Sequence, residues 1–395
     1  MADITRPLRI RKRPGLKAKR LLFGVETSWV VKDPWSLKFV RLRPEDYAVW
    51  QMLDGVKSLA DIQRRLERQF PEHQFLAEDL SRFVAQLHSQ GLVVSDESGQ
   101  GDALRERRDK NRSRELLRKW MNPMAIRFRG IDPQRVLDIV HARTAWMFNR
   151  WVVLATVAFW LSAAALILSN FNAFLARLPS QQQFLTPSGL IILSVTLGVI
   201  KILHEFGHGV SCRHFGGDCH EMGIMFLVFT PCLYCNVSDA WLFPNKWHRI
   251  AVSAAGIYVE LILASSAAYG WWFSSPGLFQ SVCLSIMFVC SVNTVVFNGN
   301  PLLRYDGYYM LSDYLEIPNL RPKAEKLLRD TFAWYCLGIE SRPDPFMPES
   351  GRPWFIAFTI ASAIYRWVVL FGITIFLYTV LKPYRLQSIG IMLAV

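Results

Sequence analysis

The chain has 395 residues, a formal net charge of +13, 51% hydrophobic residues and 14 tryptophans. Its mean hydropathy of +0.18, together with 13% aromatic residues, is typical of a membrane protein and argues against a large soluble enzyme. Residues 1–150 hold 30 Lys and Arg against 19 Asp and Glu, so +11 of the +13 charge lies there. This imbalance predicts a basic, soluble front region and an apolar back region.

The start of the chain lacks the pattern of a secretory signal peptide. The first twenty residues contain eight basic side chains and no apolar stretch of the required length. The seven cysteines include Cys232 and Cys235 at Cys-x-x-Cys spacing, but the others are scattered, unlike a secreted disulfide framework. We therefore expect the front region to remain in the cytoplasm.

The basic front region is expected to contain an arm and a small domain. Residues 1–25 predict a basic, partly disordered arm, for which a solvated, orientation-fixing tail is favoured over a nucleic-acid contact. Within 26–97, Val30-Val31 and 39–42 alternate around Pro34 as a short hairpin would. Apolar residues at helical spacing then predict three helices, and a returning strand closes the domain; these segments begin near Tyr47, Ser58, Glu78 and Gly91.

This order of hairpin, three helices and strand is that of a winged-helix-like module. It resembles the PqqD-like domains, with Arg43-Pro44-Glu45 and Leu53-Asp54-Gly55 in the corresponding places. The resemblance implies that residues 26–97 bind the leader peptide of a modified or secreted peptide, a role that the sequence leaves open. Winged helices also bind DNA, but a fold does not settle function, and no nucleic-acid partner is expected.

A charged connector leads into five long apolar stretches. Residues 98–149 are the connector, in which 105–119 are expected to lie solvated on the anionic cytoplasmic leaflet. A hydrocarbon core of about 30 Å takes about 20 helical residues. The stretches in the membrane-embedded domain at 150–385 reach or approach that length: 151–171, 190–210, 250–273, 278–297 and 355–381. Residues 222–234 are too short and broken to span, and predict a re-entrant or membrane-edge hairpin.

The basic residues beside the predicted spans indicate the orientation of the chain. Lys and Arg are concentrated in the connections on one side, which places the N-terminus in the cytoplasm. We expect a multi-pass protein of the bacterial inner (cell) membrane, with the lipid bilayer as a partner. The apolar run 389–395 looks like the start of another span, so truncation of the sequence there stays open.

His204-Glu205-Phe206-Gly207-His208 interrupts an otherwise apolar helix. Histidines at i and i+4 lie on one helical face and can reach one metal ion, while Glu205, turned about 100° from His204, can reach a metal-bound water. Such a string also arises by chance, but a charged side chain inside a membrane costs at least ~2.5 kcal/mol and needs a partner. The pattern predicts Zn2+ on His204 and His208, with a third protein ligand expected from 298–307.

HEFGH, followed about a hundred residues later by NPLLRYDG, resembles the site-2 protease family of intramembrane zinc metallopeptidases. In that family the second motif supplies an Asp ligand, which implies Asp306 here. An asparagine of the same motif orients the substrate carbonyl or oxyanion, and Asn300 is the match, with Asn298 the weaker alternative.

The resemblance covers most of residues 26–381. Residues 221–262 and 307–321 are similar to a bacterial branch called peptide zinc metalloproteases. That branch often has a PqqD-like front domain and is linked with secretion adaptors, which implies a periplasmic adaptor or an export partner. One departure is Ala255-Gly256-Ile257, where the usual proline after the glycine is replaced.

The expected fold is a multi-pass α-helical membrane protein of about five to six spans, with a site-2-protease-like core and a small α+β winged-helix-like cytoplasmic N-terminal domain. The resemblance implies a zinc metalloendopeptidase that hydrolyses peptide bonds of a membrane or precursor peptide. Glu205 would act as the base for zinc-activated water, and Asn300 would share the developing charge with the zinc.

Several alternatives stay open at this point. One is a non-proteolytic, metal-containing component of a peptide export system, and another, resting only on the winged-helix pattern, is a membrane-tethered transcription regulator. For Cys232 and Cys235, apolar packing is favoured over a metal site or redox pair with Cys219 and His220. Glu260 fits a contact with the metal site or a polar cavity equally well. The substrate and the oligomeric state are not determined by the sequence.

Overall fold

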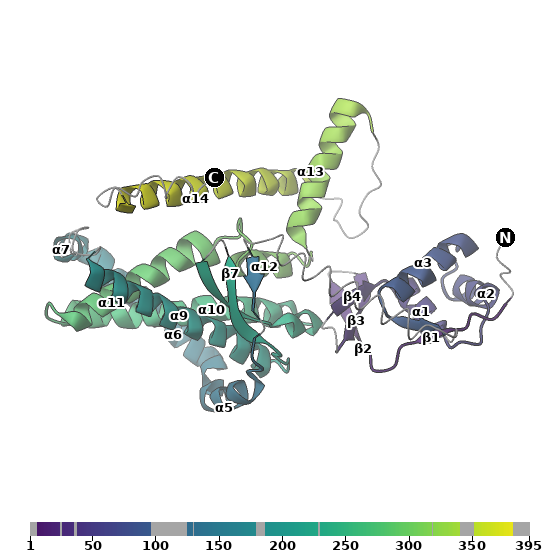
Figure 1. The fold of residues 1–395 in the computed structure, drawn as a ribbon, viewed down its shortest axis with the longest axis horizontal. Coiled ribbons are helices and arrows are strands. Elements are labelled where there is room, and N and C mark those ends of the chain that lie inside the picture. Colours follow the sequence, from purple (N-terminus) through teal and green to yellow (C-terminus); the bar gives the residue numbers. More distant parts are fainter. Residues whose placement is uncertain are drawn as a thin grey trace. The chain divides into compact units, whose positions relative to one another are not determined.

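A computed structural model describes residues 6–23, 26–34, 38–95, 125–128, 130–178, 186–227, 230–317, 319–339 and 351–381. The chain divides into two compact units, one mainly within residues 1–128 and the other mainly within 129–395, and each is described by itself (Figure 1). The predicted solvated segment 105–119 and the apolar run 389–395 lie outside the described residues.

The first unit contains two small antiparallel sheets. Strands β2 (Lys17–Phe23), β3 (Glu26–Asp33) and β4 (Lys38–Leu42) form a meander in which Val31 lies opposite both Ala18 and Val40. Strand β1 (Ile10–Lys12) pairs with β5 (Val93–Ser95), the returning strand that closes the domain.

Strands β1 and β2 occupy a region whose charge predicts a partly disordered arm. The lysines Lys17 and Lys19 of β2 are exposed, whereas Leu21 is buried. Charged side chains are common on edge strands because they discourage pairing with other chains. A high charge density is therefore compatible with a strand here, since β2 lies at the edge of its sheet.

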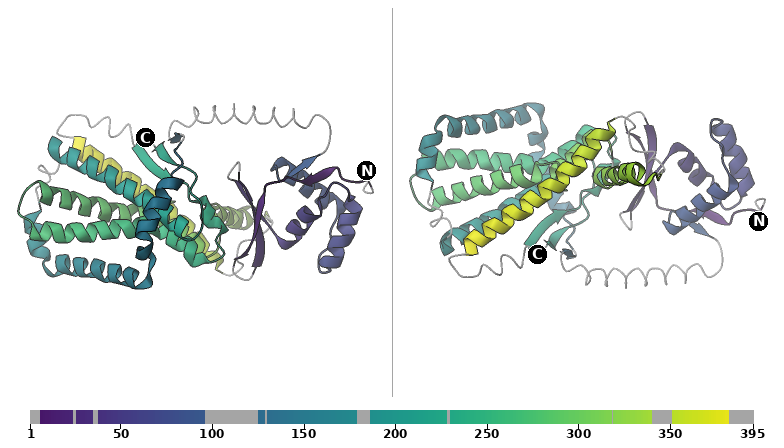
Figure 2. Two further views of the ribbon diagram at one scale, coloured as in Figure 1. Left: turned by 90° about the horizontal axis from the view of Figure 1, so that it is seen from below. Right: turned by 90° about the horizontal axis from the view of Figure 1, so that it is seen from above.

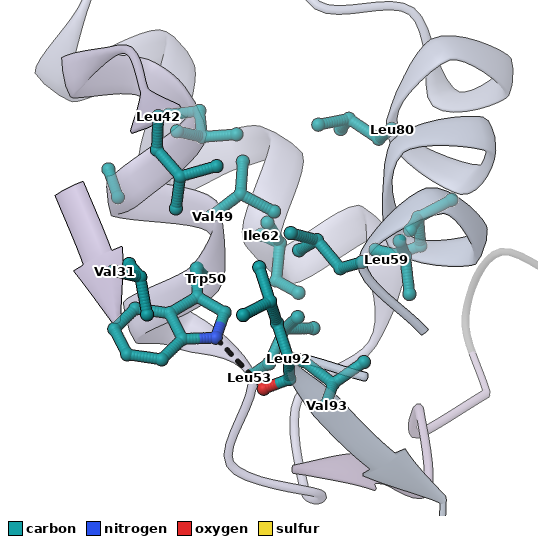
Figure 3. Packing of buried hydrophobic residues seen from close by; sticks show 14 residues of the cluster. Val31, Leu42, Val49, Trp50, Leu53, Leu59, Ile62, Leu80, Leu92 and Val93 are labelled. Atoms are coloured by element: carbon teal, nitrogen blue, oxygen red, sulfur yellow. Dashed lines mark hydrogen bonds between the residues drawn. The ribbon is translucent and has the colours of Figure 1, made fainter. Parts of the chain in front are cut away.

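Three helices, α1 (Pro44–Met52), α2 (Leu59–Gln69) and α3 (Ala77–Ser89), complete the first unit. A capping box starts α2, because the Ser58 hydroxyl accepts from the N–H of Asp61 while the Asp61 carboxylate accepts from the N–H of Ser58. The apolar faces of the three helices meet in one core. In this core the indole N–H of Trp50 donates to the carbonyl of Leu92 at 3.2 Å (Figure 3). This arrangement has the predicted winged-helix-like order.

The second unit is mostly helical. The remaining elements of the chain are β6 (Ala125–Arg127), α5 (Gln134–Thr144), η1 (Ala145–Phe148), α6 (Arg150–Ser169), α7 (Phe171–Arg177), α9 (Pro187–His214), β7 (Met222–Leu227), β8 (Thr230–Cys235), η2 (Ser238–Leu242), α10 (Lys246–Phe273), α11 (Leu278–Val292), η3 (Asn293–Asn298), α12 (Asp306–Tyr314), α13 (Leu320–Leu337) and α14 (Arg352–Leu381). Strand β6 and the described hairpin residues within Met225–Cys232 belong to the first unit, and the other elements belong mainly to the second. Strands β6, β7 and β8 pair in that order.

Among the described residues, five helical segments of this unit are long and apolar enough to cross a membrane: Arg150–Ser169, Pro187–His214, Lys246–Phe273, Leu278–Asn298 and Arg352–Ile375. They confirm the predicted multi-pass helical fold. The middle three are longer than the predicted spans, whereas the first and the last end before the predicted limits 171 and 381. The long helices run alongside one another (Figure 2), and α10 packs against α6, α9, α11 and α12. Helix α10 therefore connects the parts of the unit that carry the predicted metal-binding residues.

The fourth of these segments ends in a π-helical turn, η3. The N–H of Gly299 donates to the carbonyl of Thr294, five residues earlier, at 2.6 Å. The hydroxyl of Tyr365 on α14 donates to the carbonyl of Val296 at 3.0 Å, which satisfies a backbone acceptor of the wider turn. Isolated π-turns within helices are frequent at functional sites.

Candidate metal centre

His204 and His208 lie one turn apart on α9 and are both buried. Their spacing places the two side chains on one face of the helix, and their Nε2 atoms are 3.1 Å apart. Two imidazoles whose Nε2 atoms converge in this way leave a small region into which both lone pairs can point.

Asp306, the first residue of α12, brings a carboxylate to the same place. Its Oδ2 lies 3.1 Å from Nε2 of His204, and its Oδ1 lies 3.4 Å from Nε2 of His208. Burial alone would raise the pKa of Asp306, but the two neighbouring imidazoles lower that pKa well below its ordinary value. One ligand atom from each of the three residues lies within 4.8 Å of the other two.

The outer nitrogen of each imidazole faces an acceptor on α10. Nδ1 of His208 is 2.7 Å from the carbonyl of Val252, and Nδ1 of His204 is 2.8 Å from Oε1 of Glu260. An acceptor at Nδ1 favours the tautomer with the proton there, which leaves Nε2 free as a ligand atom. Both histidines are therefore oriented for metal binding.

Glu260 is fully buried, with 0% of its surface exposed. Besides His204, its carboxylate accepts hydrogen bonds from the amide of Asn293 and, at 2.7 Å, from the hydroxyl of Thr294. The ammonium group of Lys201 lies 3.6 Å from the same carboxylate. Of the two roles that the sequence leaves open for Glu260, the structure shows the contact with the histidine pair.

Glycines at the contact between α9 and α10 make room for the cluster. A Cβ on Gly256 would overlap both imidazoles, reaching 2.6 Å from Nε2 of His208. A Cβ on Gly207 would lie 3.0 Å from the carbonyl of Ala255. Small residues of this kind let helix backbones approach closely in membranes, so here they bring the α10 acceptors within reach of the histidines.

The two asparagines of the second motif have different surroundings. Nδ2 of the buried Asn298 lies 3.5 Å from Nε2 of His204 and 3.5 Å from Oε1 of Glu260. Oδ1 of Asn300 instead accepts from the backbone N–H of Leu302 at 2.9 Å, as in an Asx-turn. The structure thus brings Asn298, rather than Asn300, to the histidine pair.

Glu205 follows His204 on α9 and is half-buried. It points in a different direction from the histidines because successive helical residues are turned by about 100°. Glu205 is not among the three residues whose ligand atoms converge.

A second group, of Asp218, His220 and Asp239, also lies within 4.8 Å. Asp218 is already committed, because Arg213 donates to its Oδ1 at 3.0 Å and Gln134 donates to the same oxygen at 3.2 Å. The guanidinium supplies the positive charge that a cation would otherwise bring, so this group is explained by the salt bridge of Arg213.

Two comparisons with known proteins bear on these observations. Residues 28–93 match the family described as Coenzyme PQQ synthesis protein D (PqqD), which confirms the predicted PqqD-like domain. A protein of Bacillus subtilis (strain 168) named "Putative peptide zinc metalloprotease protein YydH" is 27% identical over 129 residues, which are 32% of this chain and 49% of that protein. The match spans about half the length of that relative. No solved structure matches the chain.

Proposed function

We propose that the chain is a membrane-embedded zinc metalloendopeptidase of the site-2 type, which hydrolyses peptide bonds in a membrane or precursor peptide. The observation that carries this proposal is the convergence of His204, His208 and Asp306 within 4.8 Å, with Glu205 next to His204 on α9. The helices that bring the three residues together are long and apolar enough to cross a membrane, or directly follow one that is. The similarity to a protein named as a peptide zinc metalloprotease supports the same conclusion.

The donor set fits zinc. Two imidazole nitrogens and one carboxylate are a common ligand combination of catalytic zinc sites, which keep a further position for water or substrate. Oδ2 of Asp306 is buried and, apart from its 3.1 Å approach to Nε2 of His204, has no hydrogen-bond partner among the described residues, as expected of an oxygen that shares a cation with that nitrogen. Zinc bound there would act as a Lewis acid and lower the pKa of a coordinated water.

The residues of the chain would divide the remaining work. Glu205 would accept the proton of the attacking water and return it to the leaving amine. The amide of Asn298, which lies beside the histidine pair, would donate a hydrogen bond to the carbonyl oxygen as negative charge develops on it. We assign this role to Asn298 because the side-chain oxygen of Asn300 is engaged in its own turn.

The hairpin that follows α9 offers a way to present an extended substrate. Among the described strands, β8 lies at the edge of the sheet β6-β7-β8. An edge strand can pair with an added peptide strand through main-chain hydrogen bonds. Such pairing would hold a substrate unwound, and a helical peptide bond is shielded from attack.

We also propose an orientation in the membrane and partners on each side of it. The excess of Lys and Arg on one side of the spans supports a bacterial inner membrane protein with a cytoplasmic N-terminus. The PqqD-like domain would then capture a leader peptide on the same side, and a periplasmic adaptor or export partner would act on the other.

The test uses the full chain in membranes and the variants Glu205→Gln and His204→Ala. Zinc content is measured on the purified proteins, and N-terminal peptide mapping of the host membranes reports cleavage. We expect Glu205→Gln to retain zinc and lose all chain-dependent new N-termini, whereas His204→Ala loses both. Unchanged new N-termini in Glu205→Gln would sink the protease proposal and favour a non-proteolytic export component.

A further inference from the structure

Two cysteines, Cys219 and Cys235, meet outside the candidate metal centre. Both are reduced thiols, and their Sγ atoms are 3.2 Å apart. A disulfide bond has an S–S length of about 2.05 Å, so the two sulfurs need to approach by only about an ångström. The sequence offers Cys232 as a partner for Cys235 by spacing, but the contact that the structure shows is with Cys219.

The pair lies at the open end of the β7–β8 hairpin. Cys219 precedes β7 and Cys235 is the last residue of β8, and next to them the N–H of Asn236 donates to the carbonyl of Glu221 at 2.8 Å. A Cβ added to Gly209, the neighbour of His208, would lie 3.4 Å from Sγ of Cys235. The thiols therefore lie between the hairpin and the helix that carries both histidines.

The thiols of Cys219 and Cys235 differ in pKa. The hydrogen bond from Cys235 lowers the pKa of Cys219, and the same bond, together with burial, raises the pKa of Cys235. Cys219 is therefore the thiol of the pair that ionises more readily, and its thiolate is the nucleophile. It is 1% exposed, which restricts the reaction to small oxidants.

Packing and metal binding explain this geometry less well. Thiols that only pack as apolar groups need no hydrogen bond between them, so apolar packing does not account for the Sγ–Sγ distance of 3.2 Å. Among the described residues, neither cysteine belongs to a group of three or more potential metal ligands, whereas a structural zinc site takes four.

We infer that Cys219 and Cys235 form a dithiol that hydroperoxides oxidise to an intramolecular disulfide, which ties the end of β8 to the segment that follows α9. The Cys219 thiolate attacks one oxygen of hydrogen peroxide, giving a sulfenic acid and hydroxide. The sulfur of Cys235 then attacks the sulfenic sulfur, and the S–S bond forms as water leaves. In total two thiols and one peroxide give one disulfide and two waters.

The bond would close the hairpin covalently at its base. In the context of the proposed function, it would fix the edge strand β8 beside the metal-binding helix. The inference about the disulfide itself does not depend on protease activity, because its formation is read from covalent structure alone.

The test treats the reduced full chain, purified in detergent, with hydrogen peroxide, then denatures it and alkylates the remaining thiols, so that burial alone protects no cysteine. Peptide mapping by mass spectrometry without reduction follows each cysteine. We expect a linkage between the peptides of Cys219 and Cys235, and we expect both thiols to be lost at a lower peroxide dose than the exposed Cys336. Cys219→Ser should leave Cys235 alkylatable, whereas the matched variant Cys336→Ser should not alter the linkage.

Two results would overturn the inference. One is that Cys219 and Cys235 remain alkylatable at a peroxide dose that oxidises Cys336. The other is a linkage of Cys235 to Cys212 or Cys232 in place of Cys219. Zinc content, measured on the same samples, shows whether each variant keeps the fold of the metal centre, and the linkage is scored whether or not the protein cleaves peptides.

Discussion

Oε1 of Glu260 lies 2.8 Å from Nδ1 of His204, while Nε2 of the same imidazole faces Asp306 at 3.1 Å. The imidazole of His204 thus lies between two carboxylates. That of Asp306 is on the side where the ligand atoms converge, and that of Glu260 is on the opposite side. A carboxylate behind a ligating histidine fixes the ring and raises its basicity.

Replacement of Glu260 should therefore weaken zinc binding without removing a ligand. We expect Glu260→Gln to lower zinc affinity by about 10–100-fold, measured by competition with a chelator on the purified chain. The matched control is Ser265→Ala, which changes another buried polar side chain of α10 that bonds only to its own helix. Equal zinc affinity in Glu260→Gln and the wild type would contradict this role.

The space left by Gly256 predicts a steric effect on the same centre. A methyl group at Gly256 would overlap both imidazoles, and overpacking of this kind typically costs ~1–3 kcal/mol. Gly256→Ala should therefore reduce zinc affinity about tenfold or more, by the same free-energy scale. Gly198→Ala on α9 is the control, because a Cβ there meets nothing within 4 Å; a similar loss in both variants would assign the effect to helix flexibility.

The two asparagines of the second motif can be separated kinetically. Asn298→Ala should keep zinc and lower kcat by about 10²–10³, as loss of one oxyanion donor does elsewhere. Asn300→Ala removes only the acceptor for the N–H of Leu302, so it should alter kcat much less. The kcat values are measured on a peptide whose cleavage is lost in Glu205→Gln. A larger loss of kcat in Asn300→Ala than in Asn298→Ala would assign the oxyanion contact to Asn300.

The contact between α10 and α12 predicts a pH dependence of stability. Arg249, 1% exposed, donates to Asp313 at 3.0 Å, yet burial outweighs this pair and raises the pKa of Asp313 to about 6 from 3.8. Since the protonated form is favoured in the folded state, its contribution to stability is complete below 3.8 and is lost as pH rises through about 6.

The measurement is the thermal stability of the wild type relative to Asp313→Asn, in detergent, between pH 5 and pH 7. The difference should shift against the wild type as pH rises, because the asparagine cannot ionise. A difference that stays constant over this range would show that the Arg249 pair, and not burial, governs Asp313, because a lowered pKa changes stability only below 3.8.

Much of this architecture is predictable from sequence because it rests on local periodicity. The spans follow from length and hydropathy, and the facing of His204 and His208 follows from their spacing of four on a helix. The contact of Glu260 with His204 depends instead on how closely α10 passes α9, which is set by tertiary packing at Gly207 and Gly256 and not by local periodicity. The polar residues Asn293 and Thr294 lie next to each other inside an apolar span. Such a polar pair indicates a buried polar partner on a neighbouring helix, which here is the carboxylate of Glu260.

Three further features could not be predicted for physical reasons. Asn298 and Asn300 are two residues apart, but Asn298 is the last residue of the π-helical turn and Asn300 follows it, so their side chains have different surroundings that the motif does not encode. The pairing of Cys219 with Cys235 is set by hairpin register, which no short motif encodes. In the first unit, the sequence does not indicate strands β1 and β2, because their many charged residues are also typical of a solvated arm. Edge strands tolerate such charges.

The π-helical turn η3 makes the chain sensitive to length at one place. It accommodates one more residue than an α-helical turn of the same rise, with the carbonyl of Val296 satisfied by Tyr365. Because the wide turn takes up its extra residue, the residues that follow keep the direction set by the helix before it. One further residue inserted within 293–298 would rotate the residues that follow by about 100° relative to those before. Asn298 and the approach to Asp306 would then turn away from α9, so a one-residue insertion here should be more damaging than any single side-chain replacement in the same segment.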